Sequence, residues 1–123
     1  MTKIMVVDDD EKVVDLLRIT LESEGYEVIP AFDGEDAIKK IENERPDLIL
    51  LDIMMPKIDG WEVCRKVKDD RKLRTIPVVM LTAKTQPTDR LLGIHACGAD
   101  DYITKPFEIE QIVEKVKDLL KRE

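Results

Sequence analysis

The stretch LILLDIMMPKIDG, residues 48–60, decides the fold. Its apolar run, from Leu48 to Leu51, is too short for a helix and predicts a strand that is buried on both faces. Pro56 and Gly60 are typical of turns, so we expect this strand to stop at Asp52. An aspartate at the carboxyl end of a central parallel strand lies where open α/β sheets bind ligands. Taken alone, however, Asp52 is equally well explained as a turn residue.

Length and composition limit the classes of protein to consider. The chain has 123 residues, of which 43% are hydrophobic and 38% charged, as expected for one globular domain spanning residues 1–123. Its formal net charge of -7 argues against direct nucleic-acid binding. Neither a membrane span nor a signal peptide is predicted, so we expect a cytoplasmic protein. The two cysteines, Cys64 and Cys97, are too few for a disulfide framework or zinc site, and we expect Cys64 to be a core residue.

Strands and helices are predicted to alternate along the whole chain. Apolar runs that end in polar or turn residues predict strands at 4–7, 26–31, 47–51, 77–81 and 102–103. Apolar residues at helical spacing lie between them and after the last one. The residues that we expect on the inner faces of the five helices are Val13, Leu16, Leu17, Thr20 and Leu21; Ala37, Ile38 and Ile41; Val63, Cys64 and Val67; Leu91, Leu92 and His95; and Ile109, Ile112, Val113, Val116, Leu119 and Leu120.

This alternation, with short connections, predicts an α/β fold with a doubly wound, five-stranded parallel sheet. The second strand contains Glu27 and Pro30, which suit the edge of a sheet better than its centre. The first, third and fourth strands have no polar interruption and should be central. The flavodoxin-like order 2-1-3-4-5 fits this pattern best.

Polar residues stand at the carboxyl ends of the predicted strands, and these ends meet at one edge of such a sheet. They are Asp8 and Asp9 after the first strand, Asp52 after the third, Thr82 after the fourth and Lys105 after the fifth. Three carboxylates in one pocket repel each other, and a Mg²⁺ ion would relieve that repulsion. Individually the aspartates have an ordinary explanation as helix caps, Thr82 as a strand-end hydroxyl and Lys105 as a surface residue. Their coincidence favours a site for a metal ion and a phosphoryl group.

The sequence resembles the receiver domains of response regulators, the CheY-like switches of two-component signalling. The resemblance runs from the first strand to the last helix. The matching segments are VVDD at 6–9, LLDIMMP at 50–56 with Asp59-Gly60, LTA at 81–83, GADDY at 98–102 and KPF at 105–107.

The resemblance implies a role for each matching residue. Asp52 would accept the phosphoryl group, and Asp8, Asp9 and the backbone carbonyl of Met54 would join Asp52 in binding Mg²⁺. Lys105 would pair with Asp52 and then with the phosphoryl group.

The resemblance also implies a switch and its partners. Thr82 and Tyr102 would form the switch pair, the Lys105-Pro106 peptide would be cis, and Lys84 and Met54 would tune the loss of the phosphoryl group. The expected function is that of a signalling switch, not an enzyme: a histidine kinase or phosphotransfer protein donates the phosphoryl group in a Mg²⁺-dependent reaction, with acetyl phosphate as a small donor. Slow self-dephosphorylation would reset the switch. The face formed by the fourth helix, fifth strand and fifth helix would then bind a downstream effector or output domain.

Three other functions share parts of this pattern. A Mg²⁺-dependent phosphatase of the haloacid-dehalogenase type also has an aspartate nucleophile, but it needs a second aspartate where this chain has Met54. A flavodoxin-like cofactor binder needs a loop rich in hydroxyls and glycine after the first strand. An interaction module that is never phosphorylated would not need the complete acidic pocket.

Overall fold

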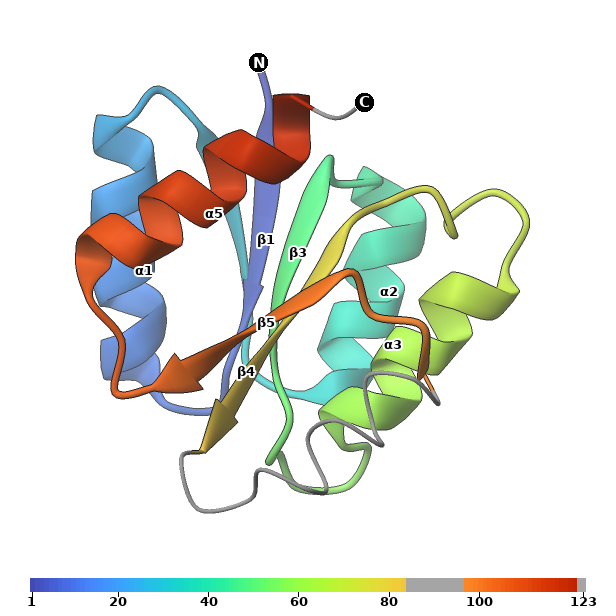
Figure 1. Cartoon of the computed structure of the whole chain (residues 1–123). Coiled ribbons are helices and arrows are strands. Elements are labelled where there is room, and N and C mark those ends of the chain that lie inside the picture. Colours follow the sequence, from blue (N-terminus) through green and yellow to red (C-terminus); the bar gives the residue numbers. More distant parts are fainter. Residues whose placement is uncertain (84–96, 122–123) are drawn as a thin grey trace.

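The computed structural model describes residues 1–83 and 97–121. Its strands form one parallel five-stranded sheet in the order β2-β1-β3-β4-β5, which confirms the predicted fold and places β2 at an edge (Figure 1). The strands are β1 (Lys3–Val7), β2 (Glu27–Ala31), β3 (Leu48–Asp52), β4 (Val78–Ala83) and β5 (Asp101–Lys105). The helices are α1 (Glu11–Ser23), α2 (Gly34–Glu44), α3 (Gly60–Asp69) and α5 (Ile109–Lys121). The predicted fourth helix, with Leu91, Leu92 and His95, and the residue Lys84 lie outside the described residues.

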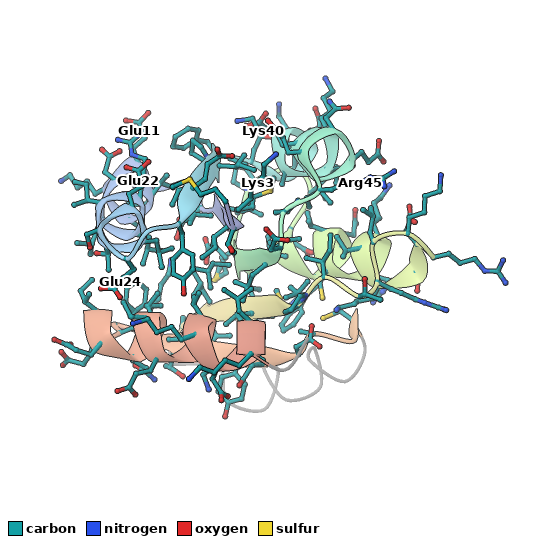
Figure 2. All side chains as sticks on the ribbon, turned by 90° about the horizontal axis from the view of Figure 1, so that it is seen from above. Lys3, Glu11, Glu22, Glu24, Lys40 and Arg45 are labelled. Carbon is teal, nitrogen blue, oxygen red and sulfur yellow. The ribbon has the colours of Figure 1, made fainter. Side chains whose placement is uncertain are left out.

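The helices cover both faces of the sheet and enclose a separate apolar core on each. Helices α1 and α5 lie on one face, and α2 and α3 on the other (Figure 1). The central strand β3 is buried along its whole length, as the apolar run of residues 48–51 predicted. Charged side chains such as Glu11, Glu22 and Arg45 lie at the periphery of the molecule (Figure 2). Within the described ranges, no helix is both long and apolar enough to cross a membrane.

Aspartates begin three of the helices by capping free backbone N–H groups. The side chains of Asp10, Asp33 and Asp59 accept hydrogen bonds from the first turns of α1, α2 and α3, respectively. The first two caps were predicted. Helix α1 stops before Gly25, whose φ of 93° lies in the left-handed region that favours glycine, as expected for a helix end. These caps fix the residue at which each helix begins. They therefore also fix the lengths of the loops at the carboxyl edge of the sheet.

The inner face of α1 differs from the prediction. Val14, Leu17 and Leu21 are buried, whereas Leu16 is 47% exposed and Val13 and Thr20 are only partly buried. Two apolar columns at helical spacing pass through Leu17 and Leu21, so spacing alone does not choose between them. Packing against the sheet and α5 selects the column that contains Val14. The inner faces predicted for α2, α3 and α5 are confirmed in their buried members, including Cys64.

Three strands are longer than predicted, β1 by only one residue, Lys3. Strand β4 continues to Ala83, and β5 runs from Asp101 to Lys105 instead of covering only residues 102–103. The residues at both ends of β5 are polar, so the apolar run in the sequence is shorter than the strand. The strand is set by its partner, because Val79 to Ala83 of β4 align with Asp101 to Lys105. This register places Lys105 at the carboxyl edge of the sheet, next to the end of β4.

Candidate functional site

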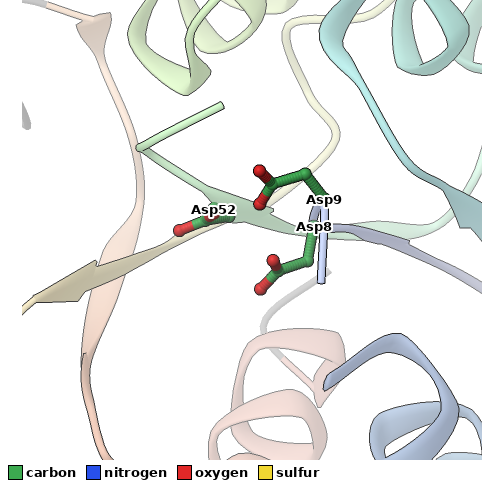
Figure 3. Close-up of side chains that lie close together, drawn as sticks. All are labelled: Asp8, Asp9 and Asp52. Atoms are coloured by element: carbon green, nitrogen blue, oxygen red, sulfur yellow. The ribbon is translucent and has the colours of Figure 1, made fainter. Parts of the chain in front are cut away.

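Three carboxylates gather at the carboxyl edge of the sheet. Asp8 and Asp9 follow β1, and Asp52 ends the neighbouring strand β3 (Figure 3). The β1–β3 register pairs Val7 with Leu51, so the residues that come next on both strands are side by side. Each carboxylate has an oxygen within 4.8 Å of an oxygen of the other two. The cluster predicted from the sequence is therefore present.

The three aspartates differ in exposure and in how they are held. Asp8 is 1% exposed and Asp52 7%, whereas Asp9 is exposed. The Asp8 carboxylate accepts a hydrogen bond from the backbone N–H of Asp10 at 3.0 Å. The Asp8 backbone N–H donates to the carbonyl of Ala31 at 3.1 Å, which ties the end of β1 to the end of β2. Two of the carboxylates are thus fixed in the wall of the pocket, and the third borders solvent.

Lys105 reaches the same pocket from the end of β5. Its Nζ donates to Asp8 Oδ2 at 2.7 Å and to Asp52 Oδ1 at 3.4 Å. The expected contact with Asp52 is present, but the shorter contact is with Asp8. Burial alone would lower the pKa of Lys105, but its hydrogen bonds and the negative charges of Asp8 and Asp52 outweigh burial and raise that pKa. Lys105 is therefore a firmly protonated cation, shared between two carboxylates.

A single lysine does not neutralise the pocket. Burial, followed by the negative charge of Asp8, raises the pKa of Asp52 from its ordinary value of 3.8 to about 6, although Lys105 opposes this rise. Oxygen ligands at this spacing and an excess of negative charge suit a hard divalent cation such as Mg²⁺. The residues present therefore fit the ion that the sequence predicted.

Met54 lies in the loop that leaves β3, two residues beyond Asp52. Its side chain is 62% exposed, while its neighbours Ile53 and Met55 are 8% exposed. The loop closes where the Gly60 N–H donates to the Ile53 carbonyl at 2.9 Å. The hydrogen bond closes the loop directly before Met54, whose backbone carbonyl stays a predicted metal ligand.

The predicted switch residues share one face of the sheet. Thr82 follows Met80 by two residues, and Met80 aligns with Tyr102 on β5, so all three lie on the face covered by α2 and α3. Thr82 is 2% exposed, and its hydroxyl is the one buried side-chain polar atom in the described ranges that has no hydrogen-bond partner. Tyr102 is partly buried against the same core. A buried hydroxyl without a partner is costly, which points to a state in which Thr82 binds a ligand atom.

One more expectation for the site is confirmed, and other features of the site were not predicted. The Lys105-Pro106 peptide is cis, as the resemblance implied. The preference of Lys105 for Asp8 was not predicted, because these residues are separated by 97 positions and no local pattern links them. The close contacts that Gly34 and Gly60 make with the Asp52 loop were also missed, because they depend on how α2 and α3 dock.

The sheet order and the acidic edge with its lysine define a receiver-type domain. Comparison with known protein families matches residues 4–117 to the response regulator receiver domain. The chain is 51% identical over 120 residues to the alkaline phosphatase synthesis transcriptional regulatory protein PhoP of Bacillus subtilis, covering 98% of this chain and 49% of that protein. The chain belongs to the response regulator receiver domain family.

Solved structures agree with this assignment. The signal receiver domain of a signal transduction histidine kinase from Syntrophus aciditrophicus has a TM-score of 0.92 at 38% identity, with 98% of this chain and 91% of that chain covered. Vibrio cholerae chemotaxis protein CheY4 has a TM-score of 0.90 at 32% identity, with 97% and 98% covered.

The family establishes the general role of the chain. It is the receiver domain of a two-component response regulator, and receiver domains act as signalling switches that bind Mg²⁺ in an acidic pocket. The chain spans about half the length of the curated relative described above.

Proposed function

We propose that this receiver takes a phosphoryl group from a phosphohistidine onto Asp52 in a Mg²⁺-dependent reaction. The observation that carries the proposal is the convergence of Asp8, Asp9, Asp52 and Lys105 in one pocket at the carboxyl edge of the sheet. Three anions and one cation leave an excess of negative charge where a metal ion and a phosphoryl group would be bound. Residues 1–123 would form one such domain, acting in the cytoplasm.

The nucleophile would be a carboxylate oxygen of Asp52. It attacks phosphorus, the new O–P bond forms, and the P–N bond to the donor imidazole breaks, leaving the electron pair on nitrogen. No general base is needed because the carboxylate attacks as an anion. Phosphoryl transfer depends on position and charge neutralisation more than on covalent help from the protein. Bound at Asp8, Asp9, Asp52 and the Met54 carbonyl, Mg²⁺ would supply positive charge to the phosphoryl oxygens.

Lys105 would exchange a carboxylate oxygen for a phosphoryl oxygen as its hydrogen-bond acceptor. It already contacts Asp8 at 2.7 Å and Asp52 at 3.4 Å, so a group attached to Asp52 would come within its reach without a large movement. A fixed cation at this position stabilises charge in the transition state because it needs no reorganisation. Water would later cleave the mixed anhydride, and the exposed Met54 and the residue Lys84 are candidates for setting that rate.

Thr82 and Tyr102 would turn the added charge into a change of surface. The new phosphoryl group brings about −1.5 to −2 charges and three acceptor oxygens. The Thr82 hydroxyl, which has no partner in the described part of the chain, would donate to one of them. Tyr102, on the same face, would then turn inward, and the surface formed by β5, α5 and the fourth helix predicted from the sequence would bind an effector or output domain. This is a shift between two populated conformations.

Intact-mass measurement tests the chemistry. We expect acetyl phosphate with Mg²⁺ to add one phosphoryl group to the wild type and none to Asp52→Asn. Asp69→Asn is the matched control, because Asp69 is exposed at the far end of α3 and should leave incorporation unchanged. Incorporation into Asp52→Asn, or undiminished incorporation after Mg²⁺ is chelated, would overturn the proposal.

Structures with and without beryllofluoride, a phosphoryl mimic, test the switch. We expect Thr82 to approach the mimic and the Tyr102 side chain to change its conformation. Identical positions of both side chains in the two states would contradict this part of the proposal while leaving the phosphorylation chemistry intact.

A further inference from the structure

The loop from Ile53 to Asp59 carries one side of the proposed metal site. It follows Asp52 directly and contains Met54, whose carbonyl is a proposed ligand. Its side chains are anchored unevenly: Ile53 and Met55 are buried, and Ile58 is partly buried against the core on the α2 and α3 side. The loop therefore follows the surface of the protein core, and elements that contact its backbone control its position.

Gly60 holds the loop at its base. A Cβ atom on Gly60 would lie 2.2 Å from the carbonyl oxygen of Asp52 and 2.8 Å from the Cα of Ile53. Both are backbone atoms, which cannot turn aside as a flexible side chain would. The first residue of α3 thus packs directly against the end of β3, and the Gly60 N–H donates to the Ile53 carbonyl at 2.9 Å.

Gly34 touches the other end of the same loop from a different helix. It is the first residue of α2, and a Cβ atom there would lie 2.5 Å from the carbonyl oxygen of Ile58 and 2.8 Å from its Cβ. Its φ lies outside the left-handed region, so any residue can adopt its backbone conformation. Close approach of the loop, and not backbone conformation, is therefore what requires glycine at position 34.

The loop and the helix that it meets are both constrained. Lys57, next to Ile58, has a φ of 67°, in the left-handed region, which a non-glycine residue adopts only where its surroundings impose it. On the other side of the contact, the Asp33 side chain accepts a hydrogen bond from the Asp36 N–H at 2.8 Å and fixes the start of α2. The first turn of α2 is thus a firm surface against which the loop is seated.

We propose that Gly34 is a positioning residue for the Mg²⁺ site. By letting the loop approach α2, it sets Ile58 and, through residues 53–59, the Met54 carbonyl relative to Asp52. This inference rests on the proposed function, in which that carbonyl is a ligand. A methyl group at position 34 would push the Ile58 carbonyl from 2.5 Å to beyond the 3.0 Å below which Cβ contacts are essentially never seen. Mg²⁺ demands near-ideal octahedral geometry, so a small displacement of one ligand weakens binding.

The experiment compares Mg²⁺ affinity in Gly34→Ala, Gly25→Ala and the wild type. Each dissociation constant is obtained from the rise of the urea midpoint with Mg²⁺ concentration, since an ion that binds only the folded state stabilises it. We expect Gly34→Ala to bind Mg²⁺ three- to tenfold more weakly. Gly25→Ala is the matched control: its φ of 93° makes alanine strained, but no atom lies within 4 Å of its added Cβ. It should lose stability and keep the wild-type dissociation constant.

Ile58→Ala decides the matter if Gly34→Ala does not fold. It loosens the same contact without adding an atom and should weaken Mg²⁺ binding about twofold or more. At saturating Mg²⁺, the folded variants should regain nearly wild-type incorporation from acetyl phosphate, because Asp52 and Lys105 are unchanged. Wild-type affinity in Gly34→Ala or Ile58→Ala, or an equal loss in Gly25→Ala, would overturn the inference. A wild type that shows no stabilisation by Mg²⁺ would instead overturn the proposed metal site.

Discussion

Lysine and aspartate meet at both edges of the sheet, in surroundings that differ in one decisive respect. At the amino edge, Lys68 Nζ lies 2.7 Å from Asp100 Oδ2. At the carboxyl edge, Lys105 Nζ lies 2.7 Å from Asp8 Oδ2. The two contacts have the same length and the same chemistry. What differs is whether the remaining polar atoms around them are satisfied.

The pair at the amino edge is satisfied. Lys68 also donates to the carbonyls of Arg74 and Ile76, at 3.1 and 2.7 Å. Asp100 Oδ2 accepts a second hydrogen bond from the Val78 N–H at 2.8 Å. These bonds connect the end of α3, the entry to β4 and the entry to β5. The charges of the pair are balanced one to one, and neither residue has a buried side-chain polar atom that lacks a partner in the described part of the chain.

The pair at the carboxyl edge is unbalanced. Lys105 is shared between Asp8 and Asp52, Asp9 adds a third negative charge, and the nearby Thr82 hydroxyl has no partner in the described part of the chain. Unbalanced charge and unsatisfied polar atoms destabilise a folded protein unless a ligand compensates for them. The comparison therefore assigns stability to the amino edge and ligand binding to the carboxyl edge.

Replacement of Lys105 should have the largest effect and should act on chemistry. We expect Lys105→Ala to reduce the initial rate of phosphoryl incorporation from acetyl phosphate about 100-fold, as is typical when one charge-stabilising group is removed. The rate is measured by intact mass over time, at saturating Mg²⁺. An unchanged rate would show that Lys105 serves only to neutralise Asp8 in the unphosphorylated protein.

Replacement of Lys68 should act on stability alone. Lys68→Ala removes the donor for two carbonyls and a carboxylate, which should lower the free energy of unfolding by about 2 kcal/mol. Urea unfolding measures the loss. The control is Lys115→Ala, which breaks a partly exposed pair with Asp101 and should cost about 0.5 kcal/mol. A tenfold loss of phosphoryl incorporation in Lys68→Ala would contradict the division of roles between the edges.

The sequence predicted the carboxyl edge better than the amino edge, for a physical reason. Apolar runs in the sequence indicate buried strands. In a parallel sheet, the polar residues that end these runs all lie at the same edge. Asp52 and Thr82 were found in this way. Lys68 and Asp100 lie in a helix and a connection, 32 residues apart, and nothing local indicates that they meet.

The same reasoning explains the errors within elements. The inner face of α1 was misjudged at Leu16 because two apolar columns share Leu17 and Leu21, and only docking on the sheet separates them. The ends of β5 were missed because Asp101 and Lys105 are polar, although pairing with β4 makes them part of the strand. Features that depend on a neighbouring element are those that the sequence of one element does not contain.

Removal of the negative charge at position 52 should stabilise the protein when Mg²⁺ is absent. Because the folded-state pKa of Asp52 is raised from 3.8 to about 6, its contribution to stability is fully present below pH 3.8 and is lost as the pH rises through about 6. The asparagine of Asp52→Asn does not ionise, so this variant does not lose stability in that way as the pH rises. After allowance for solvent screening, we expect it to be about 1–2 kcal/mol more stable than the wild type at pH 7.5.

Urea unfolding of both proteins between pH 4 and 7.5 checks the sign. The difference in unfolding free energy should grow with pH across this range and shrink when Mg²⁺ is added to the wild type. A difference that is constant with pH would mean that Asp52 ionises normally in the folded protein and that Lys105 alone balances the pocket.

The smallest expected effect concerns Thr82. One substitution there should raise the stability of the unphosphorylated protein and abolish the switch. Thr82→Val replaces a buried hydroxyl that lacks a partner with a methyl group of similar size, so the unphosphorylated protein should become about 0.5–1 kcal/mol more stable. Thr20→Val is the control, because the Thr20 hydroxyl donates to the Leu16 carbonyl at 2.8 Å and its removal should not stabilise. With beryllofluoride bound, Tyr102 in Thr82→Val should keep its unliganded conformation. A destabilised Thr82→Val would show that the hydroxyl already has a partner in the resting state, and the carboxyl edge would then be less prepared for a ligand than its carboxylates suggest.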